Sequence, residues 1–406
     1  MRRLLAVLFV LSLAAPCRAA DDAKPNTLTS KEIAEGWLLL FDGDTSFGWK
    51  VDGEVRAEKN ELFLGGSKAA TVTLPLTHFE LRLEYRNVEG IGATNLVFDR
   101  SLAKLPRKSF TTIFTGIGKE SVWSVLTLKV EPDLANPASG ESFQMKSQME
   151  SGKPGFYQNN AKYGTKDPLT LRWEIPAGNK LAVRNVKLKP LGFKPVFNGK
   201  DLTGWKKFEA DPKRAKSRFT VTEDGWLSIK NGPGDLQTSG EWADFVLQLD
   251  CRTNGDNLNS GVFFRCIPGE YQNGYEAQIQ NQRAKGQRTY TIEEHDPRTH
   301  KLLDKKNIAN WSQDYGTGAI YRRIPARRAA AKDREWFAMT VVAHGRHIAT
   351  WVNGIQMVDW TDNRPENDNA RNGCRLKKGP ISLQGHDPTT DLSFRNIRIA
   401  DLAGRN

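Results

Sequence analysis

The sequence predicts an all-β protein built from two tandem β-sandwich or jelly-roll domains. Short runs of alternating apolar and polar residues fill the chain and are separated by Gly, Pro and Asn, whereas helix-type apolar spacing is scarce. The 35 glycines and 11 tryptophans fit sheets joined by many turns. An internal repeat divides the 406 residues into two units of ordinary domain size.

The repeat is visible as segments that recur in the same order. Three pairs match: 41–50 with 197–206, 79–86 with 245–252, and 181–188 with 392–399. Such a long period indicates duplication of a whole domain rather than a stacked solenoid. We therefore expect one domain at residues 28–190 and a second at 191–403.

Residues 1–20 resemble a secretory signal. Two arginines precede an apolar stretch at 4–15, and small residues follow it. Cys17 raises the alternative of a lipoprotein, but Pro16 stands where a lipidation signal has Gly or Ala. The apolar stretch is too short for a permanent membrane span. We expect an exported protein, periplasmic or secreted, without a transmembrane anchor.

The basic charge raises the question of nucleic acid as a partner. The formal charge is +12, and it becomes 56 − 47 = +9 if the three basic residues of 1–20 are removed. Lys and Arg are scattered among Asp and Glu, and no nucleic-acid motif is present, so nucleic acid is not expected. An acidic polysaccharide or envelope surface stays open, and the oligomeric state is unknown.

Three cysteines remain after residue 20. Cys251 and Cys266 flank a predicted hairpin, so they fit either a disulfide or two buried thiols. Neither these residues nor Cys374 has the spacing of a zinc site.

Alternation places the strands of the second unit. They are predicted at 226–229, 245–252, 261–266, 275–280, 336–343, 348–352 and 381–384. Asn353-Gly354 predicts a hairpin turn. Residues 283–332 form a long polar excursion, and loops of that length often cover or build a site.

The strand at 275–280 has an unusual polar face. Glu276, Gln278 and Gln280 share one face, and Arg265 ends the preceding run. Carboxylate, amide and guanidinium groups together can bind the hydroxyl and carbonyl groups of a sugar. The alternative is an ordinary solvated sheet face.

Comparison of the two units assigns any chemistry to the second. Asn259 is replaced by Ala93, and Arg265 by Asp99. The positions of Glu276, Gln278 and Gln280 correspond to Phe110, Thr112 and Phe114, and His386 has no counterpart. The first unit is then a scaffold, a lid wall or a weak binding module.

Several segments together resemble a known family. They are 197–205, 259–265, 275–279, 351–354, 379–386 and 394–397. Over residues 191–402 the chain resembles the 3-keto-disaccharide hydrolase family, formerly a domain of unknown function, and the first unit resembles a degenerate member. One departure is Gln384-Gly385-His386-Asp387, where the family usually has Gln-Asp-His-Gly. The resemblance implies a concanavalin A-like jelly roll.

The resemblance also implies cleavage of glycosides whose sugar carries a ketone at C3. Such a ketone acidifies the C2 proton, so a base, a partner for the enolate and an acid are needed. The implied catalytic residues are Glu276 as base or cation ligand, Arg265 beside the enolate, and His386 as acid or base. The implied substrate-binding residues are Asn259, Ser260, Gln278 and Gln280. No cofactor is certain, and a divalent cation at Glu276 and His386 is left open.

Other interpretations fit the same residues. Arg265 and Glu276 could form a cross-strand ion pair, His386 could cap a turn, and Ser260 could be a turn residue. The protein could also be a non-catalytic, lectin-like carbohydrate-binding protein or a structural envelope protein. Convergence of Arg265, Glu276 and His386 on one concave face would favour an enzyme.

Overall fold

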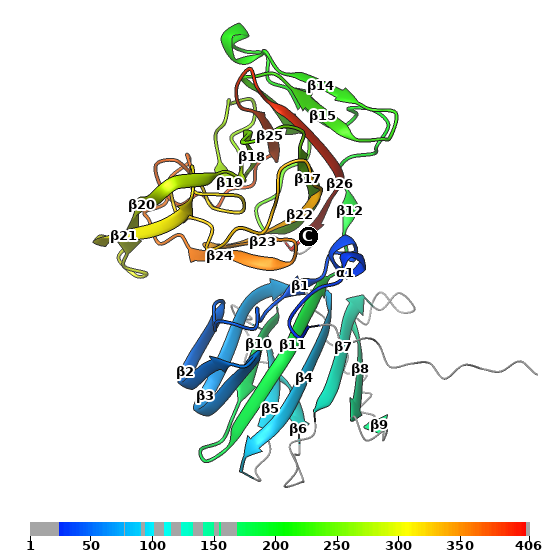
Figure 1. Ribbon diagram of the computed structural model, residues 1–406, viewed down its shortest axis with the longest axis vertical. Coiled ribbons are helices and arrows are strands. Elements are labelled where there is room, and N and C mark those ends of the chain that lie inside the picture. Colours follow the sequence, from blue (N-terminus) through cyan, green and yellow to red (C-terminus); the bar gives the residue numbers. More distant parts are fainter. Residues whose placement is uncertain are drawn as a thin grey trace, which may run out of the picture.

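The computed structural model describes residues 24–76, 78–90, 94–100, 109–114, 123–132, 141–149, 154–155 and 169–402. The predicted signal at 1–20, with Cys17, lies outside these residues, as does Ala93. The described chain is almost entirely β-strand, as predicted, with one short helix, α1 (Ser30–Glu35), near its start (Figure 1). No helix of the described residues is long and apolar enough to cross a membrane.

The second half is a sandwich of two antiparallel sheets. The larger has the order β14-β15-β26-β17-β22-β23-β24, with β12 beside β26, and the smaller has the order β13-β16-β25-β18-β19. Their bounds are β12 (Lys194–Pro195), β13 (Trp205–Lys207), β14 (Arg218–Val221), β15 (Leu227–Lys230), β16 (Gly234–Thr238), β17 (Phe245–Thr253), β18 (Asn259–Phe264), β19 (Tyr275–Gln280), β22 (Phe337–His344), β23 (His347–Val352), β24 (Ile355–Thr361), β25 (Ser382–Gly385) and β26 (Asp391–Asp401).

One apolar core lies between these two sheets. Leu247 and Val341 of the larger sheet belong to the same buried cluster as Val262, Ile279 and Leu383 of the smaller sheet. These side chains occupy alternate positions along their strands, so the opposite face of the smaller sheet is left for polar residues. The cysteines of this half are free and buried, so no disulfide links Cys251 to Cys266.

The long polar excursion forms a two-stranded arm and a following loop. The arm consists of β20 (Arg283–His295) and β21 (Leu302–Ser312), and it extends from the sandwich (Figure 1). Residues 313–334 then return to the sandwich, where the backbone of Gly318 and Ala319 hydrogen-bonds to that of Gln278 on β19.

The first half forms one sheet of eleven strands. Nine of them have the order β6-β5-β10-β3-β11-β4-β7-β8-β9, and in addition β1 pairs with β11 and β2 with β3. The bounds are β1 (Leu38–Leu39), β2 (Trp49–Glu58), β3 (Glu61–Leu76), β4 (Phe79–Glu89), β5 (Thr94–Arg100), β6 (Ser109–Phe114), β7 (Ser124–Pro132), β8 (Glu141–Met149), β9 (Pro154–Gly155), β10 (Leu169–Glu174) and β11 (Lys180–Pro190).

Both halves have the same pairing scheme. Strand β10 pairs with β3 and β5 as β25 pairs with β16 and β18, and β4 pairs with β11 and β7 as β17 pairs with β26 and β22. The difference lies in β3, which runs unbroken through the positions that correspond to β15 and β16. Because of this continuous strand, the first half has one sheet where the second has two.

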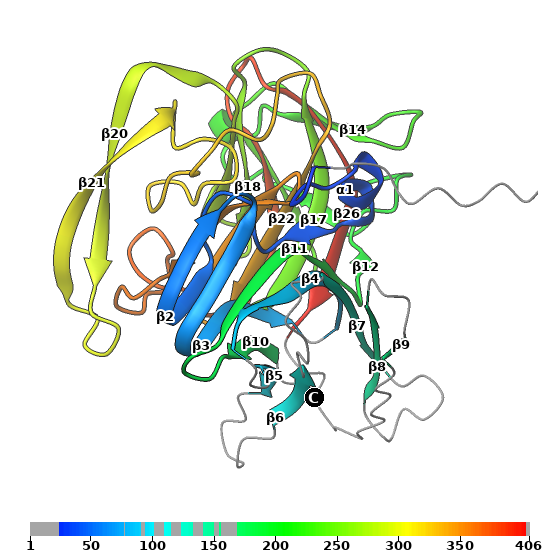
Figure 2. The same cartoon turned by 60° about the horizontal axis from the view of Figure 1, so that its bottom comes forward.

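The two halves share a hydrophobic core. Val246, Val342 and Trp351, on the outer face of the larger sheet, belong to one buried cluster with apolar residues of the first half. The Trp351 Nε1–H group donates to the carbonyl of Leu39, at 3.2 Å. Figures 1 and 2 show the sheet of the first half against this side of the sandwich. All six residues of β23 are consequently buried.

An ion-pair cluster also links the halves. The carboxylate of Asp42 lies 2.6 Å from the guanidinium of Arg327 and 3.0 Å from that of Arg328, and only 6% of the Asp42 side chain is exposed. Removal of one member of a desolvated ion pair leaves the other charge without compensation.

We therefore expect Asp42→Asn to destabilise the protein by about 2 kcal/mol, measured by thermal unfolding. The matched control is Asp44→Asn, because Asp44 is 69% exposed and 3.6 Å from Arg328. The control should change the stability by less than about 0.5 kcal/mol. Equal effects of the two substitutions would contradict the proposed link between the halves.

Candidate functional site

The polar face of the smaller sheet is the candidate site. In its strand register Glu276 lies opposite Phe263, and Gln278 lies opposite Gly261. Residues opposite one another in antiparallel strands point to the same face, so the register extends this face across β18, β25 and β16. Its polar residues are Asp235, Gln237, Asn259, Glu276, Gln278, Gln280, Ser382 and Gln384.

Glu276 is a buried carboxyl without a partner. Glu276 is 8% exposed, and no described residue forms a hydrogen bond or ion pair with its carboxyl group. Burial raises the pKa of Glu276 to about 8, against the opposing charges of Arg371 and Arg322. A Cβ atom at Gly261 would lie 2.5 Å from Glu276 Oε1, so glycine is needed there for this side-chain position.

Asp235 is a second carboxyl on the same face. It is fully buried, and its Oδ2 accepts a hydrogen bond of 2.6 Å from the backbone N–H of Gln272. Burial raises the pKa of Asp235 to about 7. The negative charge of Asp235 also raises the pKa of Glu276, so the two carboxyl groups interact.

Several buried polar atoms of this face have no hydrogen-bond partner among the described residues. They include Asp235 Oδ1, Asn259 Oδ1 and Gln384 Oε1. Buried polar atoms are normally hydrogen-bonded, by protein or by ordered water, so such a group on one face indicates a place for water or ligand. The atoms are acceptors, which suits the hydroxyl groups of a sugar.

Loops from three parts of the chain border Glu276. Tyr321 and Arg322 come from the loop after the arm, Arg371 comes from the segment before β25, and Phe263 lies beside them on β18. They enclose a hollow of about 60 Å³. That volume fits a water molecule or a hydroxyl group rather than a sugar ring.

Arg371 is a cation whose charge acts on both carboxyl groups. Its positive charge opposes the rise in pKa of Asp235 as well as that of Glu276. The Nε–H group of Arg371 donates to the carbonyl of Gln272, and the carbonyl of Arg371 accepts from Arg323 Nη2 at 2.6 Å. Arg371 is thereby fixed between the loops that border the site.

The predicted substrate-binding residues are divided between the two faces. Asn259, Gln278 and Gln280 lie on the polar face with Glu276. Two of them also hold the loop after the arm, because Gln278 Nε2 donates to the carbonyl of Asp314 and Asn259 Nδ2 lies 3.5 Å from Asp314 Oδ2. Ser260 lies between two polar-face positions and donates to the carbonyl of Gln384, so its hydroxyl group is used within the sheet.

Arg265 and His386 do not converge with Glu276. Arg265 is fully buried, and its guanidinium donates to the carbonyls of Ala243, Gly345 and Arg375 and pairs with Asp244 at 3.0 Å. The left-handed backbone at Arg265, with φ of 50°, turns the chain out of the strand at this point. The alternative interpretation, a cross-strand ion pair between Arg265 and Glu276, is therefore not realised.

His386 follows the end of β25 and is not among the residues that border the hollow at Glu276. Its side chain is 40% exposed and its Nδ1 lies 2.8 Å from Asp387. Glu276 and His386 are not brought together as ligands for a cation, and the described residues contain no group of three or more His, Cys, Asp or Glu side chains that could hold one.

The raised pKa of Glu276 predicts a pH-dependent effect on stability. A carboxyl group whose pKa is 4.5 in the unfolded chain and about 8 when folded favours folding at low pH, and this contribution is lost as the pH rises between those values. Glu276→Gln should therefore raise Tm at pH 8.5, by roughly 5 °C or more, and leave it nearly unchanged at pH 4.5. A lower Tm of the variant at pH 8.5 would contradict the burial of an unpaired carboxylate.

The solved structures that resemble the protein each cover about half of the chain. A protein of Parabacteroides distasonis described as a candidate glycosyl hydrolase is 21% identical, with 52% of this chain and 94% of that chain covered and a TM-score of 0.37. A second such protein of that organism is 24% identical, with 52% and 98% covered and a TM-score of 0.36. A lichenase from a mouse hindgut metagenome is 14% identical, with 52% and 97% covered and a TM-score of 0.30.

No curated protein matches the chain. A sequence model of the 3-keto-alpha-glucoside-1,2-lyase-like domain matches residues 192–400, which are 209 of the 406 residues. This match confirms the family that the motifs of the second unit resemble. The chain belongs to the family of carbohydrate-active 3-keto-alpha-glucoside-1,2-lyase-like domains.

Proposed function

We propose that the protein is an exported enzyme that cleaves 3-keto-glycosides at the polar face of its second half. Family membership supports a carbohydrate substrate. The observation that carries the proposal is the pair Asp235 and Glu276, two buried and interacting carboxyl groups with pKa values of about 7 and about 8. Carboxyl groups with such values can exchange protons near neutral pH.

The pair supplies a base and an acid for elimination. Asp235 is assigned as the base, because its Oδ2 accepts a hydrogen bond from the backbone N–H of Gln272, which favours the ionised form, whereas Glu276 has no such donor among the described residues. Asp235 takes the proton from C2 of the 3-keto sugar. The electrons of that C–H bond form the enolate of the C3 carbonyl, and its collapse breaks the C1–O bond. Glu276, still protonated, donates its proton to the departing oxygen. Addition of water to the resulting enone then gives net hydrolysis.

This assignment changes the roles expected from the sequence. Glu276 becomes the acid rather than the base, and Arg371 takes the place of Arg265 beside the enolate, because Arg371 is the cation that acts on both carboxyl groups. Asn259, Gln278 and Gln280 stay as substrate-binding residues. Since the hollow at Glu276 is about 60 Å³, the contact between Arg323 and Arg371 has to loosen before a sugar ring reaches the carboxyl group.

A second candidate function is carbohydrate binding without turnover. The small volume beside Glu276 favours it, because a ligand could contact the acceptor atoms of Asn259 and Gln384 without reaching the carboxyl groups. Binding of the substrate without release of its aglycone would support this alternative.

We also infer that the two halves are copies of one domain and that the first is a scaffold. The shared pairing scheme supports the duplication. The sequence has Ala69 and Phe110 at the positions that correspond to Asp235 and Glu276, so the first half has neither carboxyl group. Its contacts with the outer face of the sandwich support the scaffold role.

The proposed reaction is tested with a 3-keto-glucoside that carries a chromogenic aglycone, beside the parent glucoside. We expect release from the keto sugar alone, and Asp235→Asn and Glu276→Gln should each lower kcat/KM at least about a hundredfold. The matched control is Glu335→Gln, because Glu335 is 63% exposed and outside the face. Equal turnover of both glucosides, or full activity of Glu276→Gln, would exclude the proposal.

The two pKa values predict a bell-shaped pH profile. Because Asp235 must be ionised and Glu276 protonated, kcat/KM should rise up to about pH 7 and fall above about pH 8. The measurement is kcat/KM for the 3-keto-glucoside between pH 5 and pH 10. A profile that stays flat from pH 5 to pH 9 would show that other groups transfer the protons.

The proposed export predicts removal of residues 1–20. After expression of the full chain in a Gram-negative host, intact-mass measurement should find a protein that begins near Asp21 in the periplasm or medium. Full-length protein confined to the cytoplasm would contradict export.

A further inference from the structure

The first half contains an asparagine held in a reciprocal pair. The backbone N–H of Asn26 donates to Asn185 Oδ1, and the backbone N–H of Asn185 donates to Asn26 Oδ1, both at 2.7 Å. Asn26 Nδ2 also donates to the carbonyl of Asn60, at 2.8 Å. Asn26 is 4% exposed and lies against Gly43. Asn26 thus binds the segment that begins at residue 24 to the sheet of the first half.

Asn185 belongs to a polar group that the second half repeats. Asn185 and Arg184 both donate to Glu84, and the guanidinium of Arg184 lies 4.1 Å from the ring of Trp123. In the second half Asn396 and Arg395 both donate to Asp250, and the guanidinium of Arg395 lies 4.1 Å from the ring of Trp336.

The repeat includes the backbone as well. Asn185 has φ of 49° and Asn396 has φ of 53°, a left-handed conformation that few residue types other than Gly adopt readily. Each asparagine lies where the pairing of its strand shifts register, in β11 and β26. The two sites therefore match in side chains, backbone and position in the sheet.

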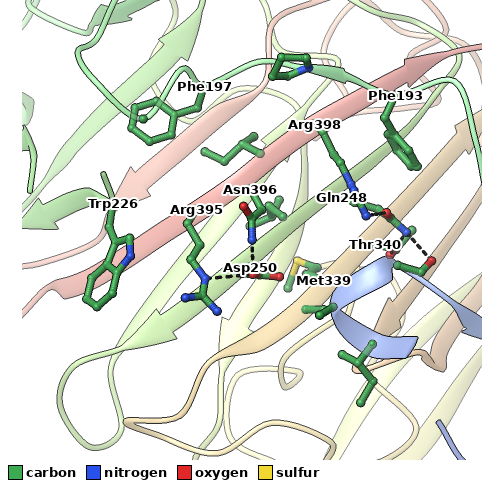
Figure 3. Close-up of a pocket in the computed structure, with 18 of the residues that line it drawn as sticks. Phe193, Phe197, Trp226, Gln248, Asp250, Met339, Thr340, Arg395, Asn396 and Arg398 are labelled. Atoms are coloured by element: carbon green, nitrogen blue, oxygen red, sulfur yellow. Dashed lines mark hydrogen bonds and ion pairs between the residues drawn. The ribbon is translucent and has the colours of Figure 1, made fainter. Parts of the chain in front are cut away.

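A cavity lined by the second half and by residues 33–38 of the first half lies at the position where the first half holds Asn26. Gly43, Asn60 and Asn185, which surround Asn26, correspond in the repeat and in the strand register to Gly199, Gly225 and Asn396. These three residues all line one cavity of about 550 Å³, within the usual range for ligand sites. Figure 3 shows Trp226, Arg395, Asn396 and Asp250 around one part of this cavity and Gln248, Thr340 and Arg398 around another.

Asn396 keeps the groups that Asn185 uses to hold Asn26. Its Nδ2 donates to Asp250 at 2.8 Å, as Asn185 Nδ2 donates to Glu84. Asn396 lies where the pairing of β26 with β17 skips from Arg395 to Arg398, and no described residue donates to its Oδ1. A donor and an acceptor therefore remain side by side at the cavity. The carbonyl of Gly225, which corresponds to that of Asn60, accepts no hydrogen bond from the described residues. Trp226, the next residue, adds an indole ring to the lining of the cavity.

We propose that this cavity binds an extended peptide segment of a partner protein, which presents an asparagine to Asn396 as Asn26 is presented to Asn185. In the first half the bound segment is an extended peptide. Its Asn26 donates through the backbone N–H group and accepts through the side-chain carbonyl oxygen. Among the described residues no segment takes this place in the second half, because residues 180–190, which correspond in the repeat to the region of Asn26, form β11. We therefore assign the place to a segment of another molecule. This site is separate from the face that carries Asp235 and Glu276.

The test uses a blocked hexapeptide with the sequence of residues 24–29, Lys-Pro-Asn-Thr-Leu-Thr, and isothermal titration of the mature full-length protein. We expect the peptide to bind, and a peptide with Leu in place of Asn to bind at least about tenfold more weakly. Leucine keeps the backbone N–H group, but its side chain can neither accept from the backbone N–H of Asn396 nor donate to the carbonyl of Gly225. Changing the peptide leaves the fold of the protein untouched.

The protein variant Asn396→Gly should also weaken peptide binding about tenfold, because glycine keeps the left-handed backbone and removes Oδ1. The matched control Asn257→Gly makes the same change at an exposed left-handed position outside the cavity and should bind like the original protein. The proposal is overturned if the peptide does not bind at millimolar concentration, if Asn396→Gly binds it unchanged, or if a neutral tetrasaccharide binds there in its place.

Discussion

Alternation of side chains across the five-stranded sheet is the constraint on which both fold and site depend. Each strand of this sheet has one set of side chains in the sandwich core and the other set on the polar face. In β19 the core set is Tyr275, Ala277 and Ile279, and the hydroxyl of Tyr275 donates to the buried Asp362. A shift of the register by one residue would bring Glu276 into the core, so core packing fixes the carboxyl in its place. The same constraint positions Asp235 on β16.

The first half packs on the outer face of the larger sheet, so the central strands of that sheet are buried on both faces. Because the outer face of β17, β22 and β23 is covered, these strands carry apolar residues on both faces. Only the smaller sheet is left with a polar face, so the site lies on the side of the sandwich away from the first half. The first half also contacts a loop that borders the candidate site. Asp42 pairs with two arginines of the loop that provides Tyr321 and Arg322.

The sequence was sufficient for the fold class, the family and part of the candidate site. Alternation placed Glu276, Gln278 and Gln280 on one face, because their strand is regular. Asp235 was missed because β16 is short and follows the bend at Asn231-Gly232-Pro233, although its polar and apolar residues alternate as those of β19 do. Arg265 was misplaced because a left-handed residue ends the alternation there. Arg371 comes from an irregular segment, for which no periodic pattern exists.

The proposed reaction depends on Asp235 and Glu276 being an interacting pair of buried carboxyl groups. Its most direct test is a carbon-detected NMR titration of protein labelled at the Asp and Glu carboxyl carbons, with Asp235→Asn and Glu276→Gln used to assign the two signals. The account predicts midpoints near pH 7 for Asp235 and near pH 8 for Glu276, with each midpoint lowered in the variant that lacks the other carboxyl. Two independent titrations near pH 4 would contradict it.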